Sequence, residues 1–386
     1  MWRNRRSAST GRPVRVLWLI KGLGPGGAER LLQLAAERRN RTDFSYEAAY
    51  VLPYKNHLVG SLEAQGVPVH CLNGGAEYDL RWALRLRRLL KKGCFDILHL
   101  HSPYVAAIAR LVVRTLPRSK RPKVISTEHV PWFGYVRPTR LLNGATFRLD
   151  DVHLAVSHAV RDSIPEALKN DVEVIVHGIA LDRVRSEAVN RERSRRELGI
   201  ADDEILIGTV ANFRAQKGYP NLLATAHILS IRGLPVRFVA VGQGPLEGQI
   251  RRDHEKLGLG DRFMLLGGLD NPARVLAGCD LFVLASLYEG LPLAMMEAFA
   301  LGLPVVVTNV PGIKEGLTDG TEGVLVPVSR PDLLAWAIED VITDPERMKR
   351  MSQAALKRSG DYDISRAVSR TEAIYTDLAT LQRVAS

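Results

Sequence analysis

The feature that most constrains the fold of this chain is a regular alternation of short apolar segments with amphipathic helical ones. Helical patterns such as 28–38, 80–92 and 104–116 separate the apolar segments. The apolar segments lie at residues 14–20, 46–52, 67–72, 97–101, 123–126, 152–156, 172–176, 205–211, 236–241, 263–266, 281–285, 304–308 and 323–326. Segments that are apolar along their whole length are typical of parallel sheets covered by helices on both faces. We therefore predict an α/β protein of two doubly wound, Rossmann-like domains that face each other across a cleft.

The boundary between the domains is expected where the chain becomes highly charged. Residues 182–198 are crowded with arginine and glutamate, which is typical of a linker that runs into a surface helix. Beyond Pro345 the pattern is helical to the end. We expect an N-terminal domain at 1–181, a C-terminal domain at 182–360 and a last helix at 361–386 that packs back on the first domain.

The net charge of +11 is unevenly divided along the chain. Residues 201–386 hold 19 basic and 23 acidic side chains, which leaves 34 basic and 19 acidic ones in residues 1–200. The basic excess therefore belongs to the half that is expected to form the first domain. It favours an anionic partner there, such as a membrane surface, a polyanionic acceptor or a nucleic acid.

Cysteine usage and hydropathy indicate a cytoplasmic protein. Cys71, Cys94 and Cys279 show no CxxC spacing, so neither a disulfide framework nor a thiolate zinc site is indicated. No apolar run approaches the roughly 18–20 residues that span a bilayer. The pair Arg5-Arg6 precedes an apolar stretch, residues 16–20, that is too short for an export signal. A peripheral position on the inner face of the membrane stays open.

A glycine motif follows the first expected strand. Gly22, Gly24 and Gly27 form a GxGxxG that opens a helix, whose free N–H groups would face a phosphate. A nicotinamide-binding domain would end its second strand with a carboxylate that holds the ribose, but residues 52–55 contain none. The alternative is that the glycines only permit a tight turn.

Two glutamates stand eight positions apart near the end of the strand at 281–285. Glu289 is expected in a loop shaped by Gly290 and Pro292, where a carboxylate can accept hydrogen bonds from sugar hydroxyls. Glu297 is expected one turn into the next helix, where it could hold the two hydroxyls of a ribose. Its neighbours are apolar, so a buried carboxylate with a partner or ligand is favoured over a solvated one.

Two cations lie at another strand-to-helix turn. Arg214 and Lys217 follow the strand at 205–211, where they could neutralise a diphosphate leaving group. Each alone would be interpreted as an exposed loop cation, but their place at the strand ends, like that of the glutamates, favours a functional role.

Together these motifs resemble the family-4 retaining glycosyltransferases of the GT-B fold. The resemblance covers nearly the whole chain from about residue 14. It implies that a sugar is transferred from a nucleotide diphosphate donor, with a UDP-sugar favoured, to an acceptor with the anomeric configuration kept and without a metal ion. The residues that carry it are Glu289 and Glu297 with the loop between them, Lys217-Gly218, 241–246, 176–179 and 24–30.

The resemblance also implies roles for individual residues. Glu297 would hold the donor ribose, and Glu289 would bind the sugar ring together with the backbone of Gly290, Leu291 and Pro292. Arg214 and Lys217 would clamp the diphosphate, Gly27 would let its loop approach it, and Gly244 would border the nucleotide pocket. His129 would contact the donor sugar near the reacting centre, and His101 would lie on the acceptor side. A hydrogen-bonded structural imidazole is the alternative for either histidine.

Three local patterns depart from the family or from this interpretation. Asn212 occupies the position of the arginine that many relatives carry five residues before the lysine, which puts the role of Arg214 in doubt. His177 replaces a common asparagine, and we interpret it as a tolerated turn variant. The triplet at 361–363 has the DxD spacing of metal-dependent transferases but lies in the helical terminal region, so it indicates helix capping. No metal and no cofactor are expected.

The acceptor side is expected in the basic first domain. Residues 80–92 and 110–123 each carry basic side chains and no acid. Each run alone is typical of a solvated helix face, but two runs and the basic N-terminal tail favour an anionic membrane surface or glycan. Nucleic acid is disfavoured because no recognition motif or interleaved aromatic pattern occurs.

The leading hypothesis is therefore a transferase that acts on a lipid-linked or polysaccharide-precursor acceptor at the cytoplasmic membrane face. A non-catalytic nucleotide-sugar-binding subunit is the alternative, and a nicotinamide-dependent oxidoreductase is a weaker one.

Overall fold

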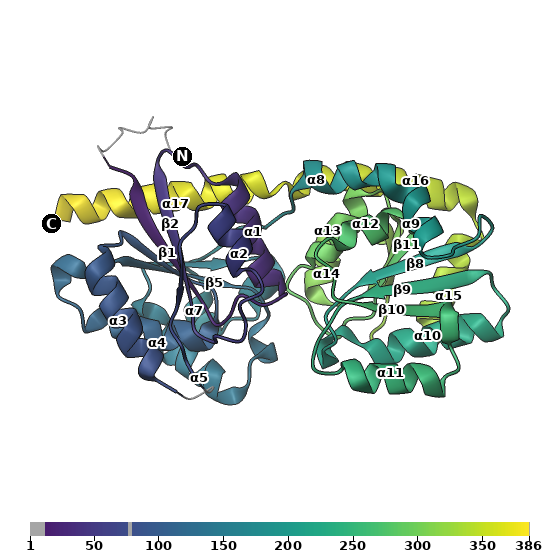
Figure 1. The fold of residues 1–386 in the computed structure, drawn as a ribbon, viewed down its shortest axis with the longest axis horizontal. Helices are drawn as coiled ribbons and strands as arrows, with labels where there is room; N and C mark the ends of the chain where they lie inside the picture. The colour runs from purple at the N-terminus through teal and green to yellow at the C-terminus, as the bar shows by residue number, and fades with distance from the viewer. Residues whose placement is uncertain (1–11, 76–78, 386) are drawn as a thin grey trace. The chain divides into compact units, whose positions relative to one another are not determined.

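The computed structural model describes residues 12–75 and 79–385, which divide into two compact units (Figure 1). The first unit holds the chain up to Val156, then Val160–Ile175, and the terminal segment from Ser365. The second unit holds Ser157–Ala159 and Val176–Ile364. Each unit is built around its own parallel sheet. The arginines of the basic N-terminal tail lie outside the described residues.

The sheet of the first unit has seven strands in the order β3-β2-β1-β4-β5-β6-β7. Their bounds are β1 Val14–Ile20, β2 Phe44–Tyr50, β3 Val69–Cys71, β4 Ile97–Leu100, β5 Lys123–Glu128, β6 Val152–Ala155 and β7 Val172–Val174. All neighbouring pairs run parallel. The order reverses between β1 and β4, so the loops after these strands diverge and leave room for a ligand.

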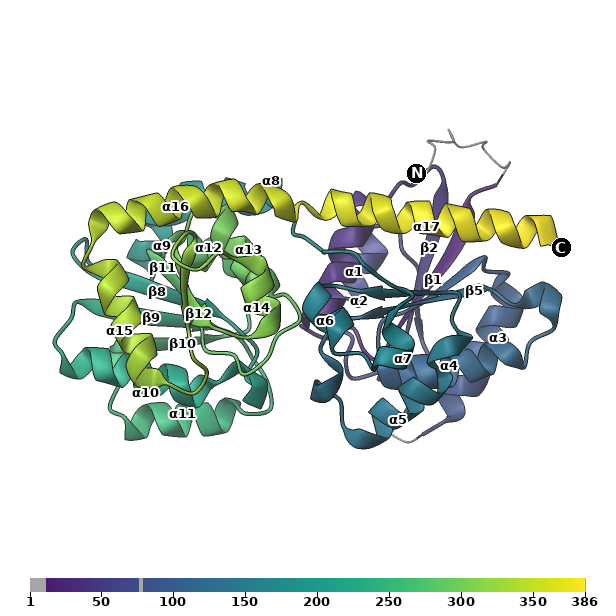
Figure 2. The ribbon, with the colours of Figure 1, turned by 180° about the vertical axis from the view of Figure 1, so that it is seen from behind.

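Helices cover both faces of this sheet (Figures 1 and 2). Side chains of α1, α2 and α17 pack on one face and those of α3 and α4 on the other, where α5 packs against α4. The helices of this part of the chain are α1 Gly27–Arg38, α2 Val59–Ala64, α3 Arg81–Gly93, α4 Pro103–Arg114, α5 Arg137–Thr146, α6 His158–Asp162, α7 Glu166–Lys169 and α17 Ile364–Ala385.

The second unit repeats the scheme with a six-stranded sheet in the order β10-β9-β8-β11-β12-β13. This is the strand order of a dinucleotide-binding Rossmann sheet, with the reversal between β8 and β11. The strands are β8 Ile205–Val210, β9 Val236–Val241, β10 Phe263–Gly267, β11 Leu281–Leu284, β12 Val305–Thr308 and β13 Gly323–Val326. The helices are α8 Leu181–Ser186, α9 Arg191–Glu197, α10 Tyr219–Ile231, α11 Glu247–Lys256, α12 Pro272–Ala277, α13 Leu293–Ala300, α14 Pro311–Gly316, α15 Pro331–Ile342 and α16 Pro345–Ser359. The predicted fold class is therefore confirmed, and each expected strand is present within a few residues.

The charged segment 182–198, which the sequence predicts as a linker that runs into a surface helix, is helical almost throughout, as α8, a short 3-10 turn and α9. Its charges find partners on neighbouring elements: Arg191 and Arg195 both pair with Asp280 at the start of β11, and Glu197 pairs with Arg274 of α12. These contacts come from distant parts of the chain, so the charge pattern alone could not reveal them.

Within the described residues, no helix is long and apolar enough to cross a membrane.

The terminal helix α17 belongs to the first unit, where Ile374, Tyr375 and Leu378 are buried in its core.

Candidate functional site

In the second unit, the loops after β8 and β11 lie against each other at the carboxyl edge of the sheet. Leu287 N donates to Gln216 O at 2.7 Å. Gly218 has φ 62°, and a Cβ there would lie 2.0 Å from Ala285 O, so no side chain fits. The close approach of these two backbones requires glycine at this position.

The approach of the loops brings Lys217 and Glu289 together. Lys217 Nζ lies 2.5 Å from Glu289 Oε1, and Ser286 Oγ donates to the same oxygen at 2.6 Å. Both charged side chains are largely buried. Arg214, by contrast, is exposed at the start of the turn. The ion pair and the serine therefore hold the carboxylate of Glu289 in place at the strand ends.

The loop Gly290–Pro292 is held by three segments from elsewhere in the second unit. Ser157 Oγ donates to Gly290 O at 2.9 Å, and a Cβ on Gly312 would lie 2.1 Å from that same oxygen. A third contact comes from His177, whose Nε2 donates to Leu291 O at 3.0 Å. Backbone that is fixed in this way is suited to binding a ligand without reorganisation.

His177 is more than a turn variant, so our interpretation of it is corrected. Its φ is not positive, and its ring is buried against the candidate donor loop. Burial lowers the pKa of His177 from its usual 6.5 to about 4, so the ring is neutral near pH 7. No spacing signal in the sequence links residue 177 to residue 291.

Glu297 lies on α13, as expected, and is 9% exposed. Met295, Met296 and Phe299 around it are fully buried. Gly244 follows β9, and a Cβ there would lie 2.6 Å from Phe213 O, so this loop also packs tightly against the loop after β8. The second unit thus gathers Lys217, Gly244, Glu289 and Glu297 on loops and a helix that follow neighbouring strands.

In the first unit, Gly27, His101 and His129 all follow strands at the carboxyl edge of the sheet. Gly27 begins α1, and nothing lies within 4 Å of the position that its Cβ would take. Packing within the described chain therefore does not demand glycine there. This is consistent with a glycine kept for the approach of a ligand to the helix N-terminus.

His101 and His129 come together after β4 and β5. His101 Nδ1 lies 3.2 Å from His129 Nε2, and their ring centroids are 5.5 Å apart. Burial, and to a lesser degree the neighbouring His99, lowers the pKa of His101 well below its usual value. The pair therefore combines a buried neutral ring with the half-buried ring of His129.

The basic runs of the first unit are engaged more than the sequence suggested. Arg110 is fully buried in a bidentate ion pair with Asp150, and its Nη1 donates to Asn143 Oδ1 at 2.6 Å. Lys123 pairs with Asp151. Arg110 is therefore unavailable to the anionic surface or glycan that the run 110–123 was expected to meet, and Lys123 is already paired, because acids after residue 149 fold back on them.

A different surface of the first unit is both apolar and basic. We call it the α5 surface: exposed Phe133, Val136, Leu141 and Leu142 with Arg137 and Arg140. Leu141 is 73% exposed and Val136 is 69% exposed. Residues 129–149, which contain it, include no acid.

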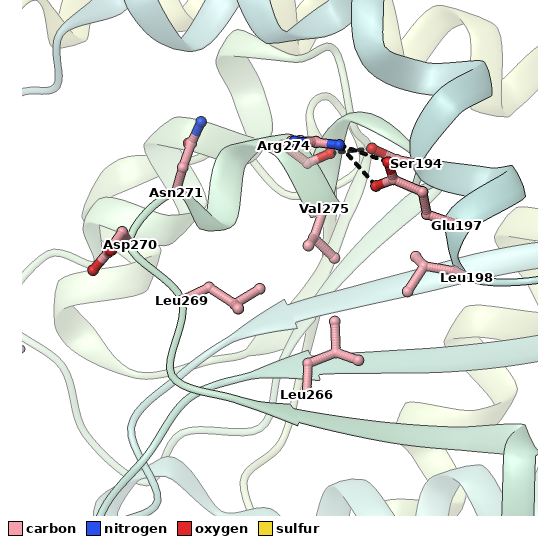
Figure 3. A pocket seen from close by; sticks show the side chains of 9 residues that line it. All are labelled: Ser194, Glu197, Leu198, Leu266, Leu269, Asp270, Asn271, Arg274 and Val275. Atoms are coloured by element: carbon pink, nitrogen blue, oxygen red, sulfur yellow. Dashed lines mark hydrogen bonds and ion pairs between the residues drawn. The ribbon is translucent and has the colours of Figure 1, made fainter.

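A pocket of about 370 Å³ opens elsewhere in the second unit, between α9, β10 and α12 (Figure 3). Leu198, Leu266 and Val275 line it, and the Glu197–Arg274 pair closes one side. Its lining includes none of the predicted site residues.

The remaining candidates concern metal binding. Among the described residues, no group of three or more His, Cys, Asp or Glu side chains is placed to hold a metal ion. In the DxD triplet, Asp361 Oδ2 lies 3.6 Å from Arg358 Nη1, and Asp363 directly precedes α17.

Two family models match this chain over adjoining segments. The model described as "Glycosyltransferase Family 4" matches residues 26–183, and the one described as "Glycosyl transferases group 1" matches residues 190–358. The chain belongs to the family-4 glycosyltransferases of the GT-B fold. The predicted family is thus confirmed, and glycosyltransferase activity follows from it.

Relatives of this glycosyltransferase span most of its length. It is 28% identical over 308 residues to N-acetyl-alpha-D-glucosaminyl L-malate synthase of Bacillus anthracis, covering 78% of this chain and 80% of that protein. It is 27% identical over 345 residues to UDP-Gal:alpha-D-GlcNAc-diphosphoundecaprenol alpha-1,3-galactosyltransferase of Escherichia coli, covering 84% and 87%.

Solved structures share the fold of this glycosyltransferase. Anabaena HepE in complex with UDP and glucose superposes with a TM-score of 0.82 at 19% identity, covering 93% of this chain and 98% of that one. Sucrose-phosphate synthase from Thermosynechococcus elongatus gives a TM-score of 0.78 at 17% identity, covering 96% and 100%.

Proposed function

We propose that this glycosyltransferase moves a sugar from a UDP-sugar to a lipid-linked or polysaccharide-precursor acceptor at the cytoplasmic membrane face, with retention of configuration and without a metal ion. The observation that carries the proposal is the buried Lys217–Glu289 pair beside the fixed loop Gly290–Pro292. A carboxylate, an ammonium group and ordered backbone N–H groups at one place suit a sugar joined to a diphosphate.

The residues of the second unit bind the donor in this proposal. Glu297 accepts hydrogen bonds from the ribose, and Gly244 borders the nucleotide. Glu289 and the backbone of Gly290–Pro292 bind the sugar hydroxyls. Lys217 and the exposed Arg214 neutralise the diphosphate as it leaves.

The residues of the first unit act near the reacting carbon and the acceptor. Gly27 admits the diphosphate to the N-terminus of α1, a helix of 12 residues whose first N–H groups can bind it. His129 contacts the donor sugar, and His101 lies on the acceptor side.

The reaction breaks the bond between the anomeric carbon and the UDP oxygen, and the acceptor oxygen then bonds to the same face of that carbon. Positive charge develops on the sugar and negative charge on the diphosphate. The diphosphate oxygen takes the proton of the acceptor hydroxyl. The negative charge on the departing UDP is stabilised by Lys217, Arg214 and the N-terminus of α1, which take the role that a metal ion has in other transferases.

Two observations support a membrane-linked acceptor. The Escherichia coli relative is, by its name, a galactosyltransferase for a diphosphoundecaprenol-linked sugar. The α5 surface of this chain combines exposed apolar side chains with arginines and no acid, which suits an anionic bilayer. The basic first unit would then face the membrane.

A thermal-shift screen of UDP-, GDP- and ADP-sugars, each with and without EDTA, tests the proposal. A UDP-sugar at about 100 times its Kd should stabilise the fold by roughly 2.7 kcal/mol, with EDTA present or absent. Incubating that donor with lipid-linked acceptors and determining the anomeric configuration of the product then tests transfer. Stabilisation only by another nucleotide, or only in the absence of EDTA, would contradict the donor and metal assignments. Binding without any turnover would favour the non-catalytic subunit.

A further inference from the structure

A line of buried polar side chains crosses the first unit from the terminal helix α17 to the carboxyl ends of strands β4 and β5. Tyr375 Oη of α17 lies 2.5 Å from His99 Nδ1 of β4, and His99 Nε2 lies 2.7 Å from Thr127 Oγ1 of β5. Tyr375 and His99 are buried.

The diagonal contact between a β4 histidine and a side chain from β5 has a counterpart two residues further along both segments. His99 of β4 lies opposite Ile125 of β5 in the parallel register, and its ring reaches diagonally to Thr127. His101 reaches diagonally to His129 in the same way, with Nδ1 and Nε2 3.2 Å apart. Alternate residues of a strand share one face of a sheet, so the rings of His99 and His101 are neighbours, with centroids 4.1 Å apart and planes tilted by 36°. We call Tyr375, His99, Thr127, His101 and His129 the histidine ladder.

Hydrogen-bond directions can be assigned along the first part of the ladder. Trp18 Nε1 can only donate and lies 3.4 Å from Tyr375 Oη, so that oxygen accepts and its own hydrogen is available for His99 Nδ1. Burial lowers the pKa of His99 to about 3, so its ring is neutral. With Nδ1 accepting, Nε2 carries the hydrogen and donates to Thr127 Oγ1. The tyrosine hydroxyl thus selects one tautomer of His99.

The position of His101 depends on this arrangement. Its ring centroid lies 4.1 Å from that of His99 and 5.5 Å from that of His129. His101 Nε2 is buried and has no hydrogen-bond partner among the described residues. An unpaired buried polar atom is costly. Because no hydrogen bond at Nε2 orients the His101 ring, its contacts with His99 and His129 must hold it in this place.

We propose that Tyr375, acting through His99, whose other ring nitrogen Thr127 holds, is a positioning residue that fixes the rings of His101 and His129. The terminal helix thereby takes part in the reaction without touching the substrate. The role for catalysis rests on the proposed function, in which His129 contacts the donor sugar. The arrangement of the rings can be tested without it.

Tyr375→Phe removes the hydroxyl and keeps the ring. Tyr46→Phe is the matched control, because Tyr46 is buried in the same aromatic cluster, 6.2 Å from the Tyr375 ring, and its hydroxyl donates to Glu372 instead. Long-range ¹H–¹⁵N spectra of the full chain labelled at histidine report which ring nitrogen carries a hydrogen. In Tyr375→Phe we expect the signals of His99, His101 and His129 to move toward those of mixed tautomers. In Tyr46→Phe we expect them to stay.

Thr127→Val is a second, isosteric variant that removes the acceptor of His99 Nε2. It should change the same ring signals, and it keeps the proposal testable if Tyr375→Phe does not fold. A change confined to His99 in both variants would overturn the proposal.

Turnover of the UDP-sugar found in the donor screen gives the catalytic readout. Tyr375→Phe should lower kcat roughly tenfold with the donor KM unchanged, the size of one lost hydrogen bond in positioning. An equal loss in Tyr46→Phe would overturn the proposal, because the loss would then come from packing. If no nucleotide sugar is turned over, the proposed function fails. The histidine spectra still show whether Tyr375 fixes the rings of His101 and His129.

Discussion

Lys217 and Glu289, 72 positions apart in sequence, form a largely buried ion pair at the carboxyl ends of β8 and β11. The pair exists because the strand order places β11 directly beside β8. Each charge is stabilised chiefly by the other, so removing one leaves the other buried without an opposite charge.

Lys217→Met should therefore destabilise the fold by about 3–5 kcal/mol, measured by urea unfolding. The double variant Lys217→Met/Glu289→Gln should recover most of that loss, because no unpaired charge remains. Arg251→Met is a control for an exposed pair, Arg251 with Glu247, and should cost less than about 1 kcal/mol. A single variant as stable as the double one would contradict the coupling.

Glu297→Gln should weaken UDP binding roughly 100-fold, because a neutral amide replaces the carboxylate proposed to hold both ribose hydroxyls. Isothermal titration calorimetry with UDP measures this. Glu339→Gln, on a partly exposed glutamate paired with Arg232 in the same unit, should leave the affinity unchanged. Undiminished UDP affinity in Glu297→Gln would refute the ribose contact.

Arg110→Lys should destabilise the first unit by about 3 kcal/mol despite keeping the charge, because lysine cannot form the two parallel bonds to Asp150. Thermal unfolding followed by near-UV circular dichroism reports the loss. Arg88→Lys, on the exposed side of α3, is the comparison and should be neutral. Equal stability of the two variants would mean that the buried network contributes little.

His177 should make stability fall with acid. Its folded pKa of about 4 lies below the usual 6.5, so the unfolded chain binds the proton more tightly. The contribution is fully present above pH 6.5 and declines as pH falls toward 4. Between about pH 7.5 and about pH 5.5 the free energy of unfolding should drop by about 1.4 kcal/mol from this residue. The stability difference between wild type and His177→Asn, measured by urea unfolding at both values, should shrink by that amount, and a constant difference would contradict the assignment.

Leu141→Asp should lower partitioning onto phosphatidylglycerol vesicles by about tenfold or more, since it removes an apolar side chain and adds a negative charge to the α5 surface. Vesicle co-sedimentation measures the bound fraction. Trp336→Asp changes a similarly exposed apolar residue in the second unit and should leave binding unchanged. Equal effects of both substitutions would argue against docking through the α5 surface.

The sequence by itself determined the sheets. The expected strands at 14–20, 236–241 and 323–326 coincide with β1, β9 and β13, because a strand covered on both faces must be apolar throughout and that signal is local. The candidate residues at the strand ends followed from the same pattern, since loops after parallel strands gather at one edge.

Only the tertiary structure decided which of these side chains meet. His99 and Tyr375 are 276 positions apart, and His177 and Leu291 are 114 apart. Arg110 and the charged segment 182–198 have the pattern of solvated charge, but oppositely charged side chains from distant parts of the chain pair with them. The hydrophobic periodicity of a segment shows which of its faces are buried. Contacts between side chains depend instead on strand order and helix packing, which bring together residues that are far apart in sequence.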